Sequence, residues 1–179
     1  MMSNLHIMCG LPASGKTTYI SKWAFVDDRV VHRDEVRAAL RERFHSDQYF
    51  PCSADEEYGY FLDACRYAAI DASSRGVDLW IDQTTLSNGS AHKLLKGLNA
   101  LQPLYTTFNM IIFEQVCTPL AVCLQRNAKR TGFECVPEDT MISMAKSYLL
   151  DMAVVRQQAY TLDMRLPMII CRHTINDLY

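Results

Sequence analysis

A segment near the N-terminus has the composition and spacing of a phosphate-binding loop. Residues 10–17 read Gly-Leu-Pro-Ala-Ser-Gly-Lys-Thr, which matches the pattern G-x-x-x-x-G-K-[ST]. The glycines let the backbone curl so that its N–H groups point at phosphate oxygens, and a following helix adds its positive end. Lys16 can then reach the β- and γ-phosphates, and the Thr17 hydroxyl can bind Mg²⁺. The segment predicts a site for a nucleoside triphosphate, with contacts from Gly10, Ala13, Ser14, Gly15, Lys16, Thr17 and Thr18.

An aspartate and an arginine follow the second predicted strand, residues 30–32. Ligands of open α/β sheets bind at the carboxyl ends of strands, so Asp34 is placed to accept the proton of an attacking acceptor hydroxyl. Arg37 lies three residues later on the same face of a predicted helix, where it can hold an anionic group of the acceptor. The plainer interpretation makes Asp34 a helix cap and Arg37 its solvated neighbour. Beside a phosphate loop, we favour catalysis.

Another acidic residue, Asp82, follows the apolar run 77–81 and precedes a polar turn. It can orient the water shell of Mg²⁺, as acids at strand ends do in phosphate-loop proteins, or it can hold Arg37 by an ion pair. The alternative is an ordinary aspartate at a strand-end turn.

Three basic residues cluster around position 130. Arg126, Lys129 and Arg130 end the helix that is predicted to begin at Pro119, and their spacing places them on one helical face. Cations are favoured at the carboxyl end of any helix, which is the explanation without a function. We interpret Arg126 and Arg130 as part of a mobile lid, at about 120–150, that neutralises charge developing on the phosphates during transfer.

Short apolar runs alternate with helical patterns along the chain, which predicts an α/β fold. The runs are almost continuously apolar, as expected of parallel strands buried on both faces. They lie at residues 5–9, 30–32, 77–81, 107–113 and 168–171. Ser53 and Glu56 form a capping box before a helix that extends to about Ser74. Pro119 and Pro137 are predicted at first helical positions.

Composition limits the possible classes of protein. The chain has 179 residues, of which 49% are hydrophobic and 21% charged, and its formal net charge is −2. We expect a single domain over residues 1–179, with no membrane span and no secretion signal. The seven cysteines are odd in number and form no Cys-x-x-Cys pair, which is typical of reduced thiols in the cytoplasm. A nucleic-acid partner would have to meet a local basic patch, because the chain as a whole is not basic.

Together, these segments resemble the polynucleotide 5′-kinase group of small P-loop kinases, over roughly residues 5–150. Residues 10–18 are similar to its phosphate loop, and Arg-Asp-Glu-Val-Arg at 33–37 is similar to its acceptor motif. Arg-Asn-Ala-Lys-Arg at 126–130, followed by Val136-Pro137, resembles its lid. The resemblance implies an adenylate-kinase-like P-loop NTPase fold, which is a three-layer sandwich with a parallel sheet in the order 2-3-1-4-5 and a helical lid.

The resemblance also implies a role for each of these residues. Asp34 would be the general base, and Arg37, supported by Asp82, would hold the phosphate beside the acceptor 5′-hydroxyl. The residues that would handle ATP are Lys16, Thr17, Arg126 and Arg130. The expected reaction transfers the γ-phosphate of ATP, with Mg²⁺, to the 5′-hydroxyl of DNA or RNA.

Two other functions are compatible with the same phosphate loop. A small-molecule or nucleotide-sugar kinase, of the zeta-toxin or antibiotic-kinase type, would keep the catalytic residues but have a closed acceptor pocket. A nucleotide-dependent switch would bind ATP without using Asp34 as a base. A polynucleotide kinase, in contrast, requires Arg37 and a groove that admits a strand.

Overall fold

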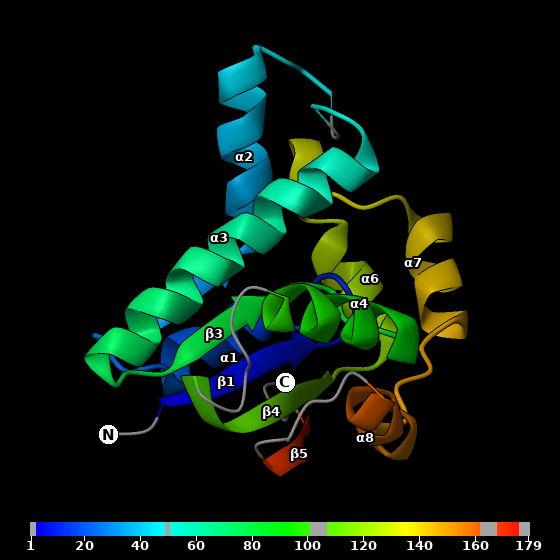
Figure 1. Ribbon diagram of the computed structural model, residues 1–179. Helices are drawn as coiled ribbons and strands as arrows, with labels where there is room; N and C mark the ends of the chain where they lie inside the picture. The colour runs from blue at the N-terminus through cyan, green and yellow to red at the C-terminus, as the bar shows by residue number, and fades with distance from the viewer. Residues whose placement is uncertain (1–2, 49–50, 101–106, 162–167, 176–179) are drawn as a thin grey trace.

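One parallel sheet forms the centre of the computed structural model, which describes residues 3–48, 51–100, 107–161 and 168–175 (Figure 1). The strands are β1 (Ser3–Cys9), β2 (Arg29–His32), β3 (Leu79–Asp82), β4 (Phe108–Cys117) and β5 (Met168–Ile175). They lie in the order β2-β3-β1-β4-β5. In the register of the central strands, Leu5 is opposite both Leu79 of β3 and Ile111 of β4. The α/β class and the parallel sheet predicted from the sequence are confirmed.

Helices cover both faces of this sheet (Figure 1). Their bounds are α1 (Lys16–Trp23), α2 (Arg33–Phe44), α3 (Ala54–Arg75), α4 (Asn88–Asn99), α6 (Leu120–Asn127), α7 (Glu138–Lys146) and α8 (Met152–Thr161), with a 3₁₀ turn η1 (Gly132–Glu134). Among these described helices, none is long and apolar enough to cross a membrane.

The side chains of β1 alternate between two apolar clusters, as the period of a strand requires. Leu5 and Ile7 are fully buried in the larger cluster, which lies against α3, α4 and α8. Met8 points to the other face, where it packs with Ile20 of α1 and with Trp80. Strand β1, at the centre of the sheet, is therefore buried on both faces, which fixes the position of its carboxyl end.

The ends of α3 show why one predicted strand was too long. Ser53 and Glu56 form the predicted capping box. At the other end, Gly76 adopts φ 67 and the Val77 N–H donates to the Ala72 carbonyl at 3.0 Å. Because the backbone of Val77 closes the helix in this way, β3 begins at Leu79, and the prediction that the strand starts at 77 was wrong.

The two prolines before α6 and α7 occupy a helix position one residue earlier than predicted, because each helix begins after its proline. Pro119 and Pro137 are N-cap residues with extended backbone, not first helical residues. Their carbonyls accept the first helical bonds, from Cys123 and Met141 respectively, each at 3.1 Å. Cys123 and Met141 are fully buried in a small apolar cluster with Leu11. This cluster packs the α6–α7 segment against the phosphate loop.

Candidate active site

The phosphate loop connects β1 to α1, as the sequence predicted. Gly10 and Gly15 have φ values of 147 and 99, and Ala13 has a φ of 59, so the backbone turns repeatedly into the left-handed region. A Cβ atom at Gly10 would lie 2.9 Å from the Val116 carbonyl oxygen. The strand therefore needs a glycine at this point, both for its backbone angle and for its close approach to β4.

The amine of Lys16 lies at the mouth of this loop. Its Nζ atom donates to the Gly10 carbonyl at 3.2 Å and to the Leu11 carbonyl at 2.9 Å. Burial lowers the pKa of this amine, although the nearby carboxylates of Asp82 and Asp34 oppose the shift. The loop thus holds a cation against its own backbone, at the point where the motif places the phosphates of a nucleotide.

Asp82 ends β3 directly beside the start of α1. Its Oδ2 atom accepts hydrogen bonds from the Thr17 hydroxyl at 2.7 Å and from Nδ1 of His32 at 3.0 Å. Burial works against ionisation of Asp82, but these bonds and the charge of Lys16 outweigh it and lower its pKa. The hydrogen bond to Asp82 raises the pKa of His32. The aspartate is therefore an anion that faces the phosphate loop.

A hydroxyl and a carboxylate in contact are a donor set that suits Mg²⁺. Among the described residues, no group of three or more His, Cys, Asp or Glu side chains could hold a metal ion. Mg²⁺ in nucleotide sites needs no such group, because waters and phosphate oxygens supply most of its ligands. Thr17 and Asp82 fit that arrangement.

The first turn of α2 presents Asp34 and Arg37 to the same region. Nη1 of Arg37 donates to Oδ1 of Asp34 at 2.8 Å, which confirms that the two side chains share a helix face. The side chain of Asp34 is 84% exposed, whereas that of Arg37 is 12% exposed. One group is accessible to a substrate, and the other is held in place.

A buried glutamate on α3 holds the arginines of this motif. Glu57 is fully buried; it accepts two hydrogen bonds from Arg33, at 3.0 and 2.6 Å, and its Oε1 lies 3.1 Å from Nε of Arg37. Two guanidinium groups thus share one buried carboxylate, which leaves the cluster cationic beside Asp34. Glu57, and not Asp82, forms this ion pair with Arg37, so the predicted pairing of Arg37 with Asp82 is corrected.

Sequence analysis missed both Glu57 and His32. Glu57 follows Glu56 in the first turn of α3, where an acidic residue is common because it suits the helix dipole. His32 is the last residue of β2 and directly precedes Arg33 and Asp34, the first two residues of α2. Its position at a carboxyl strand end was the available signal for a contact with the site.

The basic residues after α6 do not share one helical face. The helix ends at Asn127, and Lys129 and Arg130 lie beyond it in a turn whose N–H groups donate to the carbonyls of Arg126 and Asn127. The prediction of a continuous helical face was therefore wrong. Asn127 is turned toward the backbone of Val136, which draws the chain away from the helix axis. Arg130 is exposed on the loop that follows, and its Nη1 is 3.5 Å from the Glu134 carbonyl.

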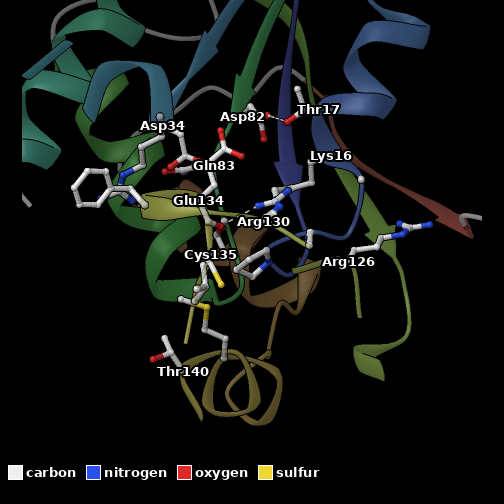
Figure 2. A pocket seen from close by; sticks show the side chains of 18 of the residues that line it. Lys16, Thr17, Asp34, Asp82, Gln83, Arg126, Arg130, Glu134, Cys135 and Thr140 are labelled. Atoms are coloured by element: carbon white, nitrogen blue, oxygen red, sulfur yellow. Dashed lines mark hydrogen bonds between the residues drawn. The ribbon is translucent and has the colours of Figure 1, made fainter. Parts of the chain in front are cut away.

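A cavity of about 910 Å³ brings these elements together (Figure 2). In the close-up, Lys16 and Thr17 line one side, Asp34 and Gln83 another, and Arg130 reaches between them. The predicted site residues that line the cavity are Ala13, Gly15, Lys16, Thr17, Thr18, Asp34, Arg37, Asp82, Arg126 and Arg130. Gly10 and Ser14 belong to the loop but are buried and do not line the cavity. The other lining residues include Gln83, Phe133 and Cys135, none of which the sequence analysis selected.

The phosphate loop, its strand–loop–helix setting and the acids at the carboxyl ends of parallel strands define a P-loop α/β protein. The family model described as "AAA domain" matches residues 5–160. The chain belongs to this family. No curated protein is significantly similar to it in sequence.

Solved structures with this architecture include kinases. A sugar kinase from Janibacter sp. superposes with a TM-score of 0.53 at 17% identity, over 93% of this chain and 97% of that one. The tunicamycin resistance protein of Deinococcus radiodurans gives a TM-score of 0.51 at 18% identity, over 93% of this chain and 98% of that one. These similarities show a fold that P-loop kinases share with this chain. The narrower resemblance to polynucleotide kinases stays a prediction.

Proposed function

We propose that this protein is an ATP-dependent phosphotransferase whose acceptor is a hydroxyl group. The observation that carries the proposal is a single cavity lined both by the phosphate loop and by the exposed carboxylate of Asp34. One part of this cavity suits the polyphosphate, and the other part offers a base and a guanidinium group. Membership of the AAA domain family and the kinase-like fold support the same class of reaction.

The transfer follows from the positions of these groups. Backbone N–H groups of the loop and the Lys16 amine bind the β- and γ-phosphates. The acceptor oxygen forms a bond to the γ-phosphorus while the bond from that phosphorus to the β–γ bridging oxygen breaks, and ADP leaves. Asp34 takes the proton of the acceptor hydroxyl. Arg126 and Arg130 neutralise negative charge that develops on the transferring group and on ADP.

Thr17 and Asp82 would hold Mg²⁺ at the same phosphates. When bound, the ion supplies positive charge and orients the phosphate oxygens. His32 keeps Asp82 ionised and turned toward the loop, because its ring nitrogen lies 3.0 Å from the carboxylate.

As the acceptor, we propose the 5′-hydroxyl end of a nucleic acid. In a strand, this hydroxyl lies one sugar away from a phosphate, and the cationic cluster of Arg33 and Arg37 lies directly beside Asp34. Planar guanidinium groups fixed by a buried carboxylate are well suited to bind phosphate oxygens. The chain has a net charge of −2, so this local cluster, and not the overall charge, would attract the strand.

A small-molecule hydroxyl is the second candidate, and one contact favours it. Phe133, on the loop after α6, lies under the guanidinium group of Arg41 on α2, with 4.5 Å between the guanidinium carbon and the ring centroid. This contact joins the loop to α2, two elements that both contribute residues to the cavity, and would limit the size of an acceptor. The two similar structures are those of a sugar kinase and of a tunicamycin resistance protein.

The direct test is transfer of labelled γ-phosphate from ATP, with Mg²⁺, to 5′-hydroxyl DNA and RNA oligonucleotides. The same oligonucleotides with a 5′-phosphate are the blocked control. We expect label only on the 5′-hydroxyl strands. Label on sugars or nucleosides from a metabolite panel, and none on strands, would favour the second candidate. ATP binding without transfer to any acceptor would favour a nucleotide-dependent switch.

Replacing Asp34 with Asn tests the base. We expect the turnover rate to fall by about 10²–10⁴-fold, the usual contribution of a general base, while ATP binding measured by calorimetry is retained. Asp63→Asn is the matched control, because Asp63 also forms an i,i+3 ion pair of 2.8 Å with an arginine, Arg66, but on α3 and away from the cavity. Equal turnover in wild type and Asp34→Asn would remove Asp34 from the mechanism.

A further inference from the structure

The loop between α6 and α7 is closed at its base by one buried side chain. The amide nitrogen of Asn127 donates to the Val136 carbonyl at 2.7 Å, and the amide oxygen accepts from the Val136 N–H at 3.0 Å. Asn127 is 5% exposed. Both polar ends of the amide are therefore satisfied by the backbone of one residue nine positions later, in the manner of a paired strand.

Besides the backbone bonds of its two turns, which join Lys129 to Arg126, Arg130 to Asn127 and Cys135 to Gly132, few described contacts fix the chain between these two residues. Residues 128–135 are all exposed, in contrast to the buried Asn127. Two side-chain contacts of the loop residues are made to groups other than Asn127: Arg130 lies 3.5 Å from the Glu134 carbonyl, and the Phe133 ring packs against Arg41 of α2. The first lies within the loop itself. The double hydrogen bond at the base thus fixes where the loop returns to the end of α6.

The position of the loop matters because Arg126 and Arg130 lie on either side of Asn127 in the sequence. Arg126 is in the last turn of α6 and Arg130 is on the loop, and both line the cavity, whereas Asn127 does not. Without the bonds to Val136, the exposed loop could swing, and the distance between the two guanidinium groups would vary. Charge stabilisation in a transition state requires groups that are already in place.

We propose that Asn127 is a positioning residue that holds Arg130 beside Arg126 over the polyphosphate. Its catalytic part rests on the proposed function, since the arginines act on a transferring phosphate. Its structural part, the closed base of the loop, does not depend on the acceptor or on the reaction.

The structural part is tested by limited trypsin digestion, because Lys129 and Arg130 are cleavage points within the loop. We expect Asn127→Ala to raise the cleavage rate there by about tenfold, as the loss of hydrogen bonds of this kind allows. A non-hydrolysable ATP analogue should protect the loop in wild type and protect it less in the variant. Equal cleavage rates and equal protection in the two proteins would overturn the proposal.

The matched control is Asn88→Ala. The Asn88 amide oxygen also accepts from a distant backbone, the Asp151 N–H at 2.7 Å, but it does so at the start of α4. Cleavage after Lys129 and Arg130 should be unchanged in this variant. Asn127→Asp keeps the acceptor but places a carboxylate oxygen against the Val136 carbonyl in place of the donor, so, if the alanine variant does not fold, this variant should also be cleaved faster than wild type.

The catalytic part is tested by combining Asn127→Ala with Arg130→Ala. Alone, Asn127→Ala should lower the turnover rate by about tenfold and change the KM for ATP by less than about threefold. In the Arg130→Ala background it should cause no further loss, because the group that it positions is absent. Independent, multiplying losses would overturn the positioning role. If wild type transfers phosphate to no acceptor, the proposed function fails, while the trypsin comparison still decides whether Asn127 holds the loop.

Discussion

Strand β3 has an aspartate at each end, and each contacts a histidine. Asp78 precedes the strand and lies 3.2 Å from Nε2 of His6, and Asp82 ends it 3.0 Å from Nδ1 of His32. For both aspartates burial disfavours the anion, but hydrogen bonds outweigh it and lower the pKa. The pKa values of both histidines are raised. In both pairs, therefore, the pKa shifts of the carboxylate and of the imidazole have the same directions.

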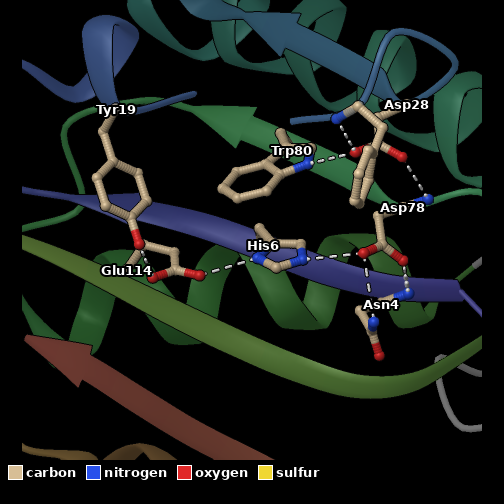
Figure 3. A network of polar contacts seen from close by, with 8 residues as sticks. Asn4, His6, Tyr19, Asp28, Asp78, Trp80 and Glu114 are labelled. Carbon is tan, nitrogen blue, oxygen red and sulfur yellow. Dashed lines mark hydrogen bonds and ion pairs between the residues drawn. The ribbon is translucent and has the colours of Figure 1, made fainter. Parts of the chain in front are cut away.

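Their surroundings differ. His6 is 4% exposed, stacked on Trp80 at 3.8 Å between ring centroids, and held on its other side by Glu114 at 2.9 Å (Figure 3). The second oxygen of Glu114 accepts from the Tyr19 hydroxyl at 3.0 Å, and neither His6 nor Asp78 lines the cavity. Asp82, in contrast, lines the cavity with Thr17. An ion pair with shifted pKa values therefore identifies a candidate site only when it faces a cavity that a ligand can enter.

The largest expected difference comes from removing each carboxylate in turn. Asp82→Asn should lower the rate of phosphate transfer by about 100-fold, the effect usual for a residue that orients a metal site. Asp78→Asn should leave the rate within about threefold and lower the free energy of unfolding by about 1–3 kcal/mol, because asparagine keeps one acceptor oxygen and either the Asn4 N–H or His6 loses its partly buried acceptor. Transfer assays and urea unfolding of both variants measure the two effects.

We expect the variant with the larger loss of transfer rate to have the smaller loss of stability. Thr17 and His32 can turn to water in the cavity when Asp82 loses its charge, so Asp82→Asn should cost less stability than Asp78→Asn. If Asp78→Asn slowed transfer as much as Asp82→Asn, the division between structural and functional pairs would be wrong.

A smaller effect is expected at the acceptor part of the cavity. Arg37→Ala removes a guanidinium group that Glu57 holds beside Asp34, and should raise the KM for the acceptor by about tenfold, the value of one hydrogen bond between charged groups. Binding of ATP, measured separately by calorimetry, should change little, since the phosphate loop is intact. A larger loss of ATP binding than of acceptor binding would contradict this role for Arg37.

The smallest effect is the pH dependence of the stability that His6 contributes. Burial lowers the pKa of His6, but hydrogen bonds to Asp78 and Glu114 outweigh it and raise the pKa above 6.5. Charged His6 therefore contributes stability that is complete below the unfolded-state pKa and is lost as pH rises through the folded-state pKa. The stability advantage of wild type over His6→Gln should be larger at about pH 6 than at about pH 9. Urea unfolding at both values measures it, and an advantage independent of pH would show that His6 does not change charge there.

Local features of the chain predicted the parts of the site that lie close together in sequence. The phosphate loop is contiguous, so its glycines, Lys16 and Thr17 determine its backbone path and its chemistry together. Asp34 and Arg37 are three residues apart on one helix, which makes them neighbours whatever else the chain does. The capping box of Ser53 and Glu56 is equally local, and the structure confirms it.

The tertiary structure alone decided the contacts that cross the fold. Glu57 reaches Arg33 across 24 residues, and Asp82 reaches His32 across 50, because the packing of α3 on α2 and the register of β2 with β3 bring them together. The end of α6 was mispredicted for the same reason, since its stop depends on the bond from Asn127 to Val136 and not on helix propensity. Sequence spacing determines neighbours within an element, whereas burial and strand register select the partners between elements.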